Sequence, residues 1–273
     1  QLRGSHCDLL HRCRVPVPKH QQAMTAAAIE YILCDVGTVR RACAEHSWLD
    51  SVLSSDEIDR SNRFRRADDR AGYRCAHLIF RLMAARSLGL EPSNAGELRF
   101  TRTCRSCGGP HGKPQIAGED AGAELSMSRS GDMLLVASAP PSSPIGVDVE
   151  RIPAEVFTGF DDYALAPTES VPHGGDGVRR RLELWVAKEA AVKTTGHGLA
   201  VAPNKLEVVR AAAATSPAHS AAQWTASISA AAYSDLNQLN IASVPCRPGY
   251  SAALSCPGAP RISSLNLSDL LAG

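Results

Sequence analysis

The sequence has no excess of charge of either sign. It contains 29 lysine and arginine residues and 28 aspartate and glutamate residues, which gives a formal net charge of +1. Proteins that bind nucleic acid or an anionic membrane surface usually carry a clear basic excess. We therefore expect no nucleic-acid partner, and any phosphate-binding patch must be local. One cluster of arginines is the candidate for such a patch: Arg60, Arg63, Arg65, Arg66, Arg70 and Arg74.

Long apolar runs are also missing. No stretch approaches the roughly 18 consecutive apolar residues that a membrane span needs, and the sequence opens without a charged and then apolar leader. The nine cysteines are an odd number, and a chain of 273 residues with 44% hydrophobic content can bury a core without disulfides. We expect a soluble cytoplasmic protein with reduced thiols and no membrane partner.

One cysteine pair has metal-ligand spacing but lacks a counterpart. Cys104 and Cys107 are separated by two residues, and His111 follows four residues later, as in half of a zinc knuckle. No other cysteine pair in the sequence has this spacing. Because structural zinc takes four ligands, a tight glycine-rich turn is the favoured interpretation. The alternative, a zinc-binding interaction module, predicts stoichiometric zinc in the purified protein.

Two segments carry the clearest chemical pattern. Apolar residues recur at every second position of Ile145–Glu150, so in an extended strand Asp148 and Glu150 would point to the same face. Trp185–Lys193 has the spacing of a helix, and its glutamate and final lysine are four residues apart on one face. Either segment alone fits an ordinary solvated strand edge or a surface ion pair. Only their combination indicates a site.

The two segments together suit a divalent cation and a phosphate. If the helix packs against the strand, Asp148, Glu150 and Glu189 can converge on one magnesium ion that keeps positions open for water and substrate. Lys193 would then neutralise phosphate charge.

The order of expected elements predicts an α+β protein with two similar halves. The alternation and helical periods favour strands over 29–36 and 133–139, a helix from Ser55, which we expect to cap it, and a long helix over 70–88. A strand is also expected over 97–101, and the proline-rich segment 139–144 reads as the linker. Further strands are expected over 205–209, 223–228, 239–243 and 250–254, with 211–222 as a loop.

The segments Ile145–Glu150 and Trp185–Lys193 resemble the two signature motifs of the 4′-phosphopantetheinyl transferases. The order and spacing of other blocks resemble the surfactin-synthetase-activating type, over roughly residues 30 to 256 of the chain. These further blocks are His111–Pro114, Ser126–Gly131, Pro167–Glu169, Gly196–Leu199 and Gly249–Ala253.

The resemblance implies a pseudo-twofold pair of α+β halves with coenzyme A and the active site in the cleft between them. With the linker as the boundary, we expect an N-terminal half over 26–141 and a C-terminal half with the metal site over 142–258. Residues 1–25, which show no clear period, are expected to be a disordered extension, and 259–273 a tail.

The activity implied by the resemblance is that of a magnesium-dependent holo-[acyl-carrier-protein] synthase. Such an enzyme moves the 4′-phosphopantetheine arm of coenzyme A to a serine of an apo acyl, peptidyl or aryl carrier protein and releases adenosine 3′,5′-bisphosphate. In that frame Asp148, Glu150 and Glu189 hold Mg²⁺, Glu189 accepts the serine proton directly or through a water on the metal, and Lys193 stabilises the pyrophosphate. Glu169 is a weaker candidate for positioning water.

The resemblance also assigns residues to coenzyme A. They are Arg60, Arg63, His111, Gly112, Lys113, Pro114, Ser128, Arg129 and Lys193. Arg129 departs from the family, which usually has histidine between the two serines, and this departure leaves a catalytically weakened coenzyme A or carrier-binding paralogue as the alternative. The type is typically monomeric and serves secondary metabolism, and we expect a carrier to dock on apolar residues around 157–165.

Overall fold

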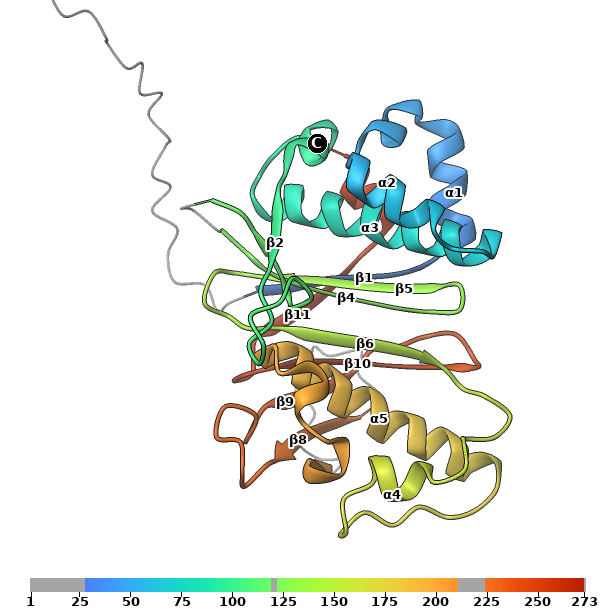
Figure 1. The fold of residues 1–273 in the computed structure, drawn as a ribbon, viewed down its shortest axis with the longest axis vertical. Coiled ribbons are helices and arrows are strands. Elements are labelled where there is room, and N and C mark those ends of the chain that lie inside the picture. The colour runs from blue at the N-terminus through green and yellow to red at the C-terminus, as the bar shows by residue number, and fades with distance from the viewer. Residues whose placement is uncertain (1–27, 119–121, 211–223, 273) are drawn as a thin grey trace, which may run out of the picture.

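The structure is a computed structural model that describes residues 28–118, 122–210 and 224–272. Two mainly antiparallel sheets form the middle layers, and helices cover the outer face of each (Figure 1). The first sheet has the order β11 (Arg261–Leu265), β1 (Ala28–Asp35), β5 (Met133–Ala139), β4 (Glu124–Ser130). The second has the order β6 (Gly146–Arg151), β10 (Tyr250–Cys256), β9 (Asn240–Ser243), β8 (Thr225–Ser229), β7 (Glu207–Arg210).

The core between the sheets follows from the period of two in the strands. In β5, Leu135 and Ala137 face the second sheet, where they meet Val147 and Val149 of β6. The side chains that alternate with them, Leu134 and Val136, point to the other face of the sheet and pack against the helices. The seven residues of β5, apolar except for Ser138, are therefore all buried, because the strand is covered on both faces.

The first sheet is covered by α3 (Ala67–Ser87), which packs on β4 and β5. The shorter α1 (Val36–Glu45) and α2 (Ser55–Asn62) pack against α3. Ser54, rather than the expected Ser55, caps α2, and it forms a reciprocal capping box with Glu57. Glu57 also binds His77 and Arg81 of α3, at 3.0 and 2.6 Å, so this buried carboxylate fastens α2 onto the long helix.

The second sheet is covered by α5 (Gly175–Thr195), with the short α4 (Phe160–Ala164) beside it (Figure 1). The buried face of α5 carries small side chains such as Ala187, Ala190 and Ala191, which allow a close approach to the sheet. The approach is closest at Gly146, where an added Cβ would lie 1.9 Å from the carbonyl oxygen of Ala190. Only glycine fits at that position, and its absent side chain brings β6 against α5.

A two-stranded ribbon of β2 (Phe100–Arg102) and β3 (Pro114–Ile116) extends from the N-terminal half toward the end of α5 (Figure 1). The loop at its tip is tied to the C-terminal half by Arg105, which pairs with Asp235 and donates to the carbonyl of Thr195. Short 3-10 helices complete the described chain: Ser47–Ser51, Pro92–Glu97, Gly198–Ala200 and Pro203–Lys205.

The structure differs from the sequence-based expectations at several places. Residues 259–273 are not a tail, because β11 pairs in parallel with β1 and α6 (Leu267–Leu271) packs on α3. The expected strand over 97–101 begins only at Phe100, since the proline at position 92 starts a 3-10 helix. The extension over 1–25 and the loop over 211–222 lie outside the described residues. Among the described helices, none combines the length and the apolar character that crossing a membrane requires.

Candidate active site

Three serines at alternate positions of β4 face the edge strand β6 of the other sheet. Ser126 Oγ accepts from the backbone amide of Val147 at 3.0 Å. Ser128 and Ser130 donate to the acidic side chains of β6, to Asp148 Oδ1 at 2.7 Å and to Glu150 Oε2 at 2.6 Å. The serine row therefore fixes the register of β6 against β4 and presents both carboxylates at the junction of the two halves.

Asp148 is the centre of the site. Its side chain is 3% exposed, and Lys193 Nζ of α5 donates to its Oδ1 at 2.6 Å and to Ser128 Oγ at 3.1 Å. The other oxygen, Oδ2, is buried and has no hydrogen-bond partner among the described residues. A buried carboxylate oxygen without a partner is costly. The arrangement thus leaves a strong acceptor free for a cation.

The two remaining acids share the electrostatic environment of Asp148. The pKa of Glu189 is raised to about 6, chiefly by burial, with the charges of Asp148 and Glu150 also raising it and Lys193 lowering it. Burial likewise raises the pKa of Glu150, against the hydrogen bond from Ser130 that lowers it. Like charges held together in a half-buried place resist ionisation, and a divalent cation relieves that cost.

The donor set fits magnesium. Oxygen ligands from Asp148, Glu150 and Glu189 are the kind that this ion prefers, and Asp148 Oδ2 is the free atom that it would satisfy. Oxygens of the three acids do not lie within 4.8 Å of one another, a closeness that only Cys104, Cys107 and His111 reach in the described part of the chain.

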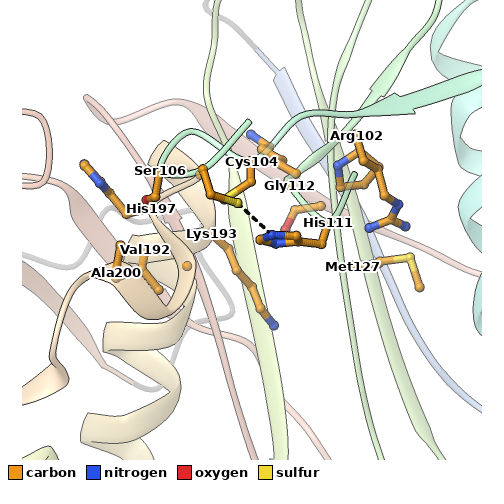
Figure 2. A pocket seen from close by; sticks show the side chains of 16 residues that line it. Arg102, Cys104, Ser106, His111, Gly112, Met127, Val192, Lys193, His197 and Ala200 are labelled. Atoms are coloured by element: carbon orange, nitrogen blue, oxygen red, sulfur yellow. Dashed lines mark hydrogen bonds between the residues drawn. The ribbon is translucent and has the colours of Figure 1, made fainter. Parts of the chain in front are cut away.

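A cavity of about 590 Å³ adjoins the site and is lined by both halves of the chain. Lys193 belongs to its wall as well as to the carboxylate group, and Figure 2 shows this side chain projecting from α5 beneath the loop that carries Cys104 and His111. The volume of the cavity is typical of a pocket for a small molecule. Three more of the expected coenzyme A residues, Gly112, Lys113 and Pro114, line it with His111.

Lys113 is held in place from two sides. Its Nζ donates to Glu124 Oε2 at 2.7 Å and to the carbonyl of Thr194 at 3.4 Å, so it bridges β4 and the end of α5. The residue before it, Gly112, lies so close to the carbonyl oxygen of Thr103 that an added Cβ would be 2.0 Å from this oxygen. The glycine before the lysine is therefore explained by backbone contact.

Other expected site residues lie elsewhere. Arg60, in the last turn of α2, and Arg63, its C-cap, are exposed and are not among the residues that line the cavity. Arg129 points to the opposite face of β4 from Ser128, lies across Gly72 of α3 and donates to the carbonyl of Gly131.

Glu169 is committed to the backbone. It accepts from Val208 N and Ala166 N and pairs with the buried Lys188 at 2.5 Å. Positioning water is therefore not its role in this structure. Both of its oxygens are engaged on the flank of α5 that faces α4 and β7.

The contacts of Ser130 with Glu150 and of Glu124 with Lys113 were not predicted from the sequence. The alternating serines of β4 could have indicated the contact of Ser130 with Glu150, because they recur at the same period of two residues as the acids of β6. The contact of Glu124 with Lys113 joins two residues that lie close together only in the folded protein.

Comparison with known proteins agrees with this geometry. Residues 144–243 match the family model of the 4′-phosphopantetheinyl transferase superfamily. The chain is 30% identical over 174 residues to the 4′-phosphopantetheinyl transferase HetI of Nostoc, which covers 60% of this chain and 66% of the relative. It is 28% identical over 162 residues to a putative 4′-phosphopantetheinyl transferase of Synechocystis, which covers 57% of this chain and 62% of the relative. These matches support the 4′-phosphopantetheinyl transferase superfamily.

The matched region contains the site that the structure assembles. Asp148, Glu150, Glu189 and Lys193 all lie within the residues that match the superfamily, whereas the β4 serines and the β2–β3 loop lie before them. The chain spans slightly less than two thirds of the length of either relative.

Proposed function

We propose that this protein transfers the 4′-phosphopantetheine arm of coenzyme A to a serine of an apo acyl, peptidyl or aryl carrier protein. The single observation that carries the proposal is the contact of Lys193 with the buried Asp148 beside Glu150 and Glu189, at the wall of a cavity. A metal site next to a fixed cation and a pocket is what transfer of a phosphoryl-linked group requires. The superfamily match supports the choice of this reaction.

In the proposed reaction, the serine oxygen of the carrier attacks the phosphorus that bears the pantetheine arm. The bond from that phosphorus to the bridging pyrophosphate oxygen breaks, and adenosine 3′,5′-bisphosphate leaves. Glu189 accepts the serine proton, directly or through a water on the metal. Lys193 stabilises the charge of the pyrophosphate and of the leaving group, and Lys113 adds a second cation on the cavity wall.

Asp148, through its free Oδ2, and the carboxylates of Glu150 and Glu189 are the residues proposed to hold magnesium. When bound, the ion neutralises pyrophosphate charge and orients the reacting group. The serines of β4 set the positions of the first two ligands, and the close packing at Gly146 sets the distance of α5 from them.

The finer assignment is also a proposal. We assign the protein to the surfactin-synthetase-activating type, acting as a cytoplasmic monomer on carriers of secondary metabolism. The signature blocks and their spacing support this assignment. Arg129 contacts α3 rather than Ser128, so the arginine that stands where the family has histidine leaves Ser128, Asp148 and Lys193 in contact.

The test is mass spectrometry of apo carrier proteins of the three kinds after incubation with this protein, coenzyme A and magnesium. We expect a gain of one phosphopantetheine arm with the native protein, and none with Glu189→Gln. Glu183→Gln is the matched control, because Glu183 lies on the same helix but pairs with Arg180 and Arg210 outside the site. If the native protein binds coenzyme A yet modifies no carrier, the protein is a binding paralogue and the proposal is overturned.

A further inference from the structure

The loop between β2 and β3 brings three soft metal ligands together. The Sγ atoms of Cys104 and Cys107 and a ring nitrogen of His111 all lie within 4.8 Å of one another, and Cys107 Sγ is 3.0 Å from His111 Nε2 (Figure 2). Tetrahedral zinc, with bonds of about 2.0–2.3 Å, holds its ligand atoms roughly 3.5–3.8 Å apart. Shifts of about 1 Å or less would therefore convert this cluster into a coordination sphere.

The backbone of the loop is built to hold these ligands. Cys104 N donates to the carbonyl of Gly109 and Gly108 N donates to the carbonyl of Cys104, both at 2.8 Å, which closes a tight turn around the pair of thiols. Gly109 N also donates to Cys107 Sγ at 3.4 Å. An added Cβ at Gly109 would lie 3.1 Å from His111 Nε2 and 3.2 Å from Cys107 Sγ, so glycine keeps the space beside both ligand atoms clear.

The sulfur of Cys104 is prepared in the same way. Backbone amides of Cys107 and Ser106 lower the pKa of its thiol, which favours the thiolate that ligates metals. Both Cys107 and His111 are exposed, so an ion can reach the cluster from solvent. All three side chains also line the 590 Å³ cavity.

We propose that Cys104, Cys107 and His111 bind one zinc ion whose fourth position opens toward the cavity and holds water in the ligand-free protein. Two thiolates, one imidazole and one open position form a recognised zinc ligand set. Each thiol gives up its proton to solvent when its sulfur ligates the ion, so binding releases protons and weakens as the pH falls. The ion fixes the loop that carries Lys113, and its binding is independent of the transfer reaction proposed above.

The test measures zinc in the full-length reduced protein after equilibration with zinc and removal of the excess. We expect about one zinc per chain, and replacement by cobalt should give the absorption of a thiolate-bound, four-coordinate ion. In Cys107→Ser the affinity should fall at least about 100-fold, beyond the effect of losing an outer-shell contact. His111→Ala should also lose zinc while keeping the fold, because this exposed loop adds little to the core.

The matched control is Cys7→Ser/Cys13→Ser. These cysteines and His11 lie outside the described residues but offer the same ligand chemistry, so the control must retain its zinc. The protein is reduced before the assay, so any disulfide between Cys104 and Cys107 formed during isolation is removed. The proposal is overturned if this reduced native protein binds less than about 0.2 zinc per chain. It is also overturned if zinc persists in Cys107→Ser or disappears in the control, since the ion would then be bound elsewhere.

Discussion

Lys193 Nζ lies 2.6 Å from Asp148 Oδ1 and joins the end of α5 to the edge strand of its sheet. The lysine side chain is 30% exposed and the aspartate 3%, so the ion pair bridges the cavity wall and the interior. A cation in this position is held by a buried partner and still faces a ligand.

Replacement of Lys193 by glutamine should therefore damage transfer more than folding. We expect kcat/KM for coenzyme A to fall by about 10²-fold or more, because the pyrophosphate charge loses a pre-positioned cation. Steady-state kinetics with one carrier measure this. Lys205 is exposed and does not line the cavity, so Lys205→Gln is the control and should keep its activity. A folded Lys193→Gln variant with native kcat/KM would contradict the role.

Magnesium should stabilise the protein more strongly at higher pH. The folded-state pKa of Glu189, about 6, lies above the ordinary value of 4.5, so its contribution to stability is present below pH 4.5 and is lost as the pH rises through 6. That loss, on the order of 2 kcal/mol, is what a cation bound to the carboxylate offsets. We expect the gain in Tm on adding Mg²⁺ to be larger at pH 7.5 than at pH 5.5. Glu189→Gln should show little gain at either pH, and an equal gain in native protein and variant would rule out this ligand.

The buried pair of Lys188 and Glu169 should be needed for stability but not for the reaction. Their side chains are 1% and 7% exposed, and Lys188 also donates to the carbonyl of Ala164. Lys188→Met leaves a buried carboxylate without its cation, which should lower the free energy of unfolding by about 3–5 kcal/mol. The double variant Lys188→Met/Glu169→Gln should recover part of that loss in urea unfolding. A single variant within about 1 kcal/mol of native would contradict the pairing.

Acid should weaken the attachment of α2 to α3. Burial alone would raise the pKa of Glu57, but hydrogen bonds from His77, the Ser54 amide and Arg81 lower it to about 2. Its contribution to stability is present above the ordinary pKa of 4.5 and is lost as the pH falls through 2, on the order of 3 kcal/mol in total. Between pH 5 and pH 2, the free energy of unfolding should fall less steeply with decreasing pH in Glu57→Gln than in the native protein. Parallel curves would mean that the carboxylate gains nothing from these partners.

The aromatic cluster beside α5 is the expected docking site for carriers. Phe157 and Tyr163 are 56% and 45% exposed and stack near the buried Phe160 and the half-buried Trp185. Phe157→Ser and Tyr163→Ser should each raise KM for the carrier about tenfold and leave KM for coenzyme A unchanged. Val209→Ser removes an equally exposed apolar side chain from β7 and serves as the control. Unchanged carrier kinetics in both aromatic variants would place docking elsewhere.

Local periodicity predicted much of what positions the site. The alternation of Ile145–Glu150 predicted a strand with Asp148 and Glu150 on one face, and the structure places both acids against the serines of β4. The helical spacing around Glu189 and Lys193 likewise predicted α5. These patterns are readable because each depends on neighbours within one element.

Contacts between elements were harder to predict. The spacing of residues does not predict that Arg129 of β4 contacts α3, because this depends on how the helix packs on the sheet. Nor does it predict that Lys113 pairs with Glu124, which depends on how the ribbon packs beside β4. The free oxygen of Asp148 is a three-dimensional property as well. The role considered for Glu169 failed for the same reason, because a carboxylate near two signature motifs in sequence is turned toward backbone amides in space.

The parallel pairing of β11 with β1 has a consequence for folding. Ala28 and Arg261 are partners, so the first sheet is completed only by a strand that follows the whole of the second one. Such a pairing has a very large sequence separation, and its loop-closure entropy must be met before the contact forms. The N-terminal half therefore contains a strand that lies beyond the C-terminal half in sequence, and removing β11 would leave β1 with an unpaired edge in the first sheet.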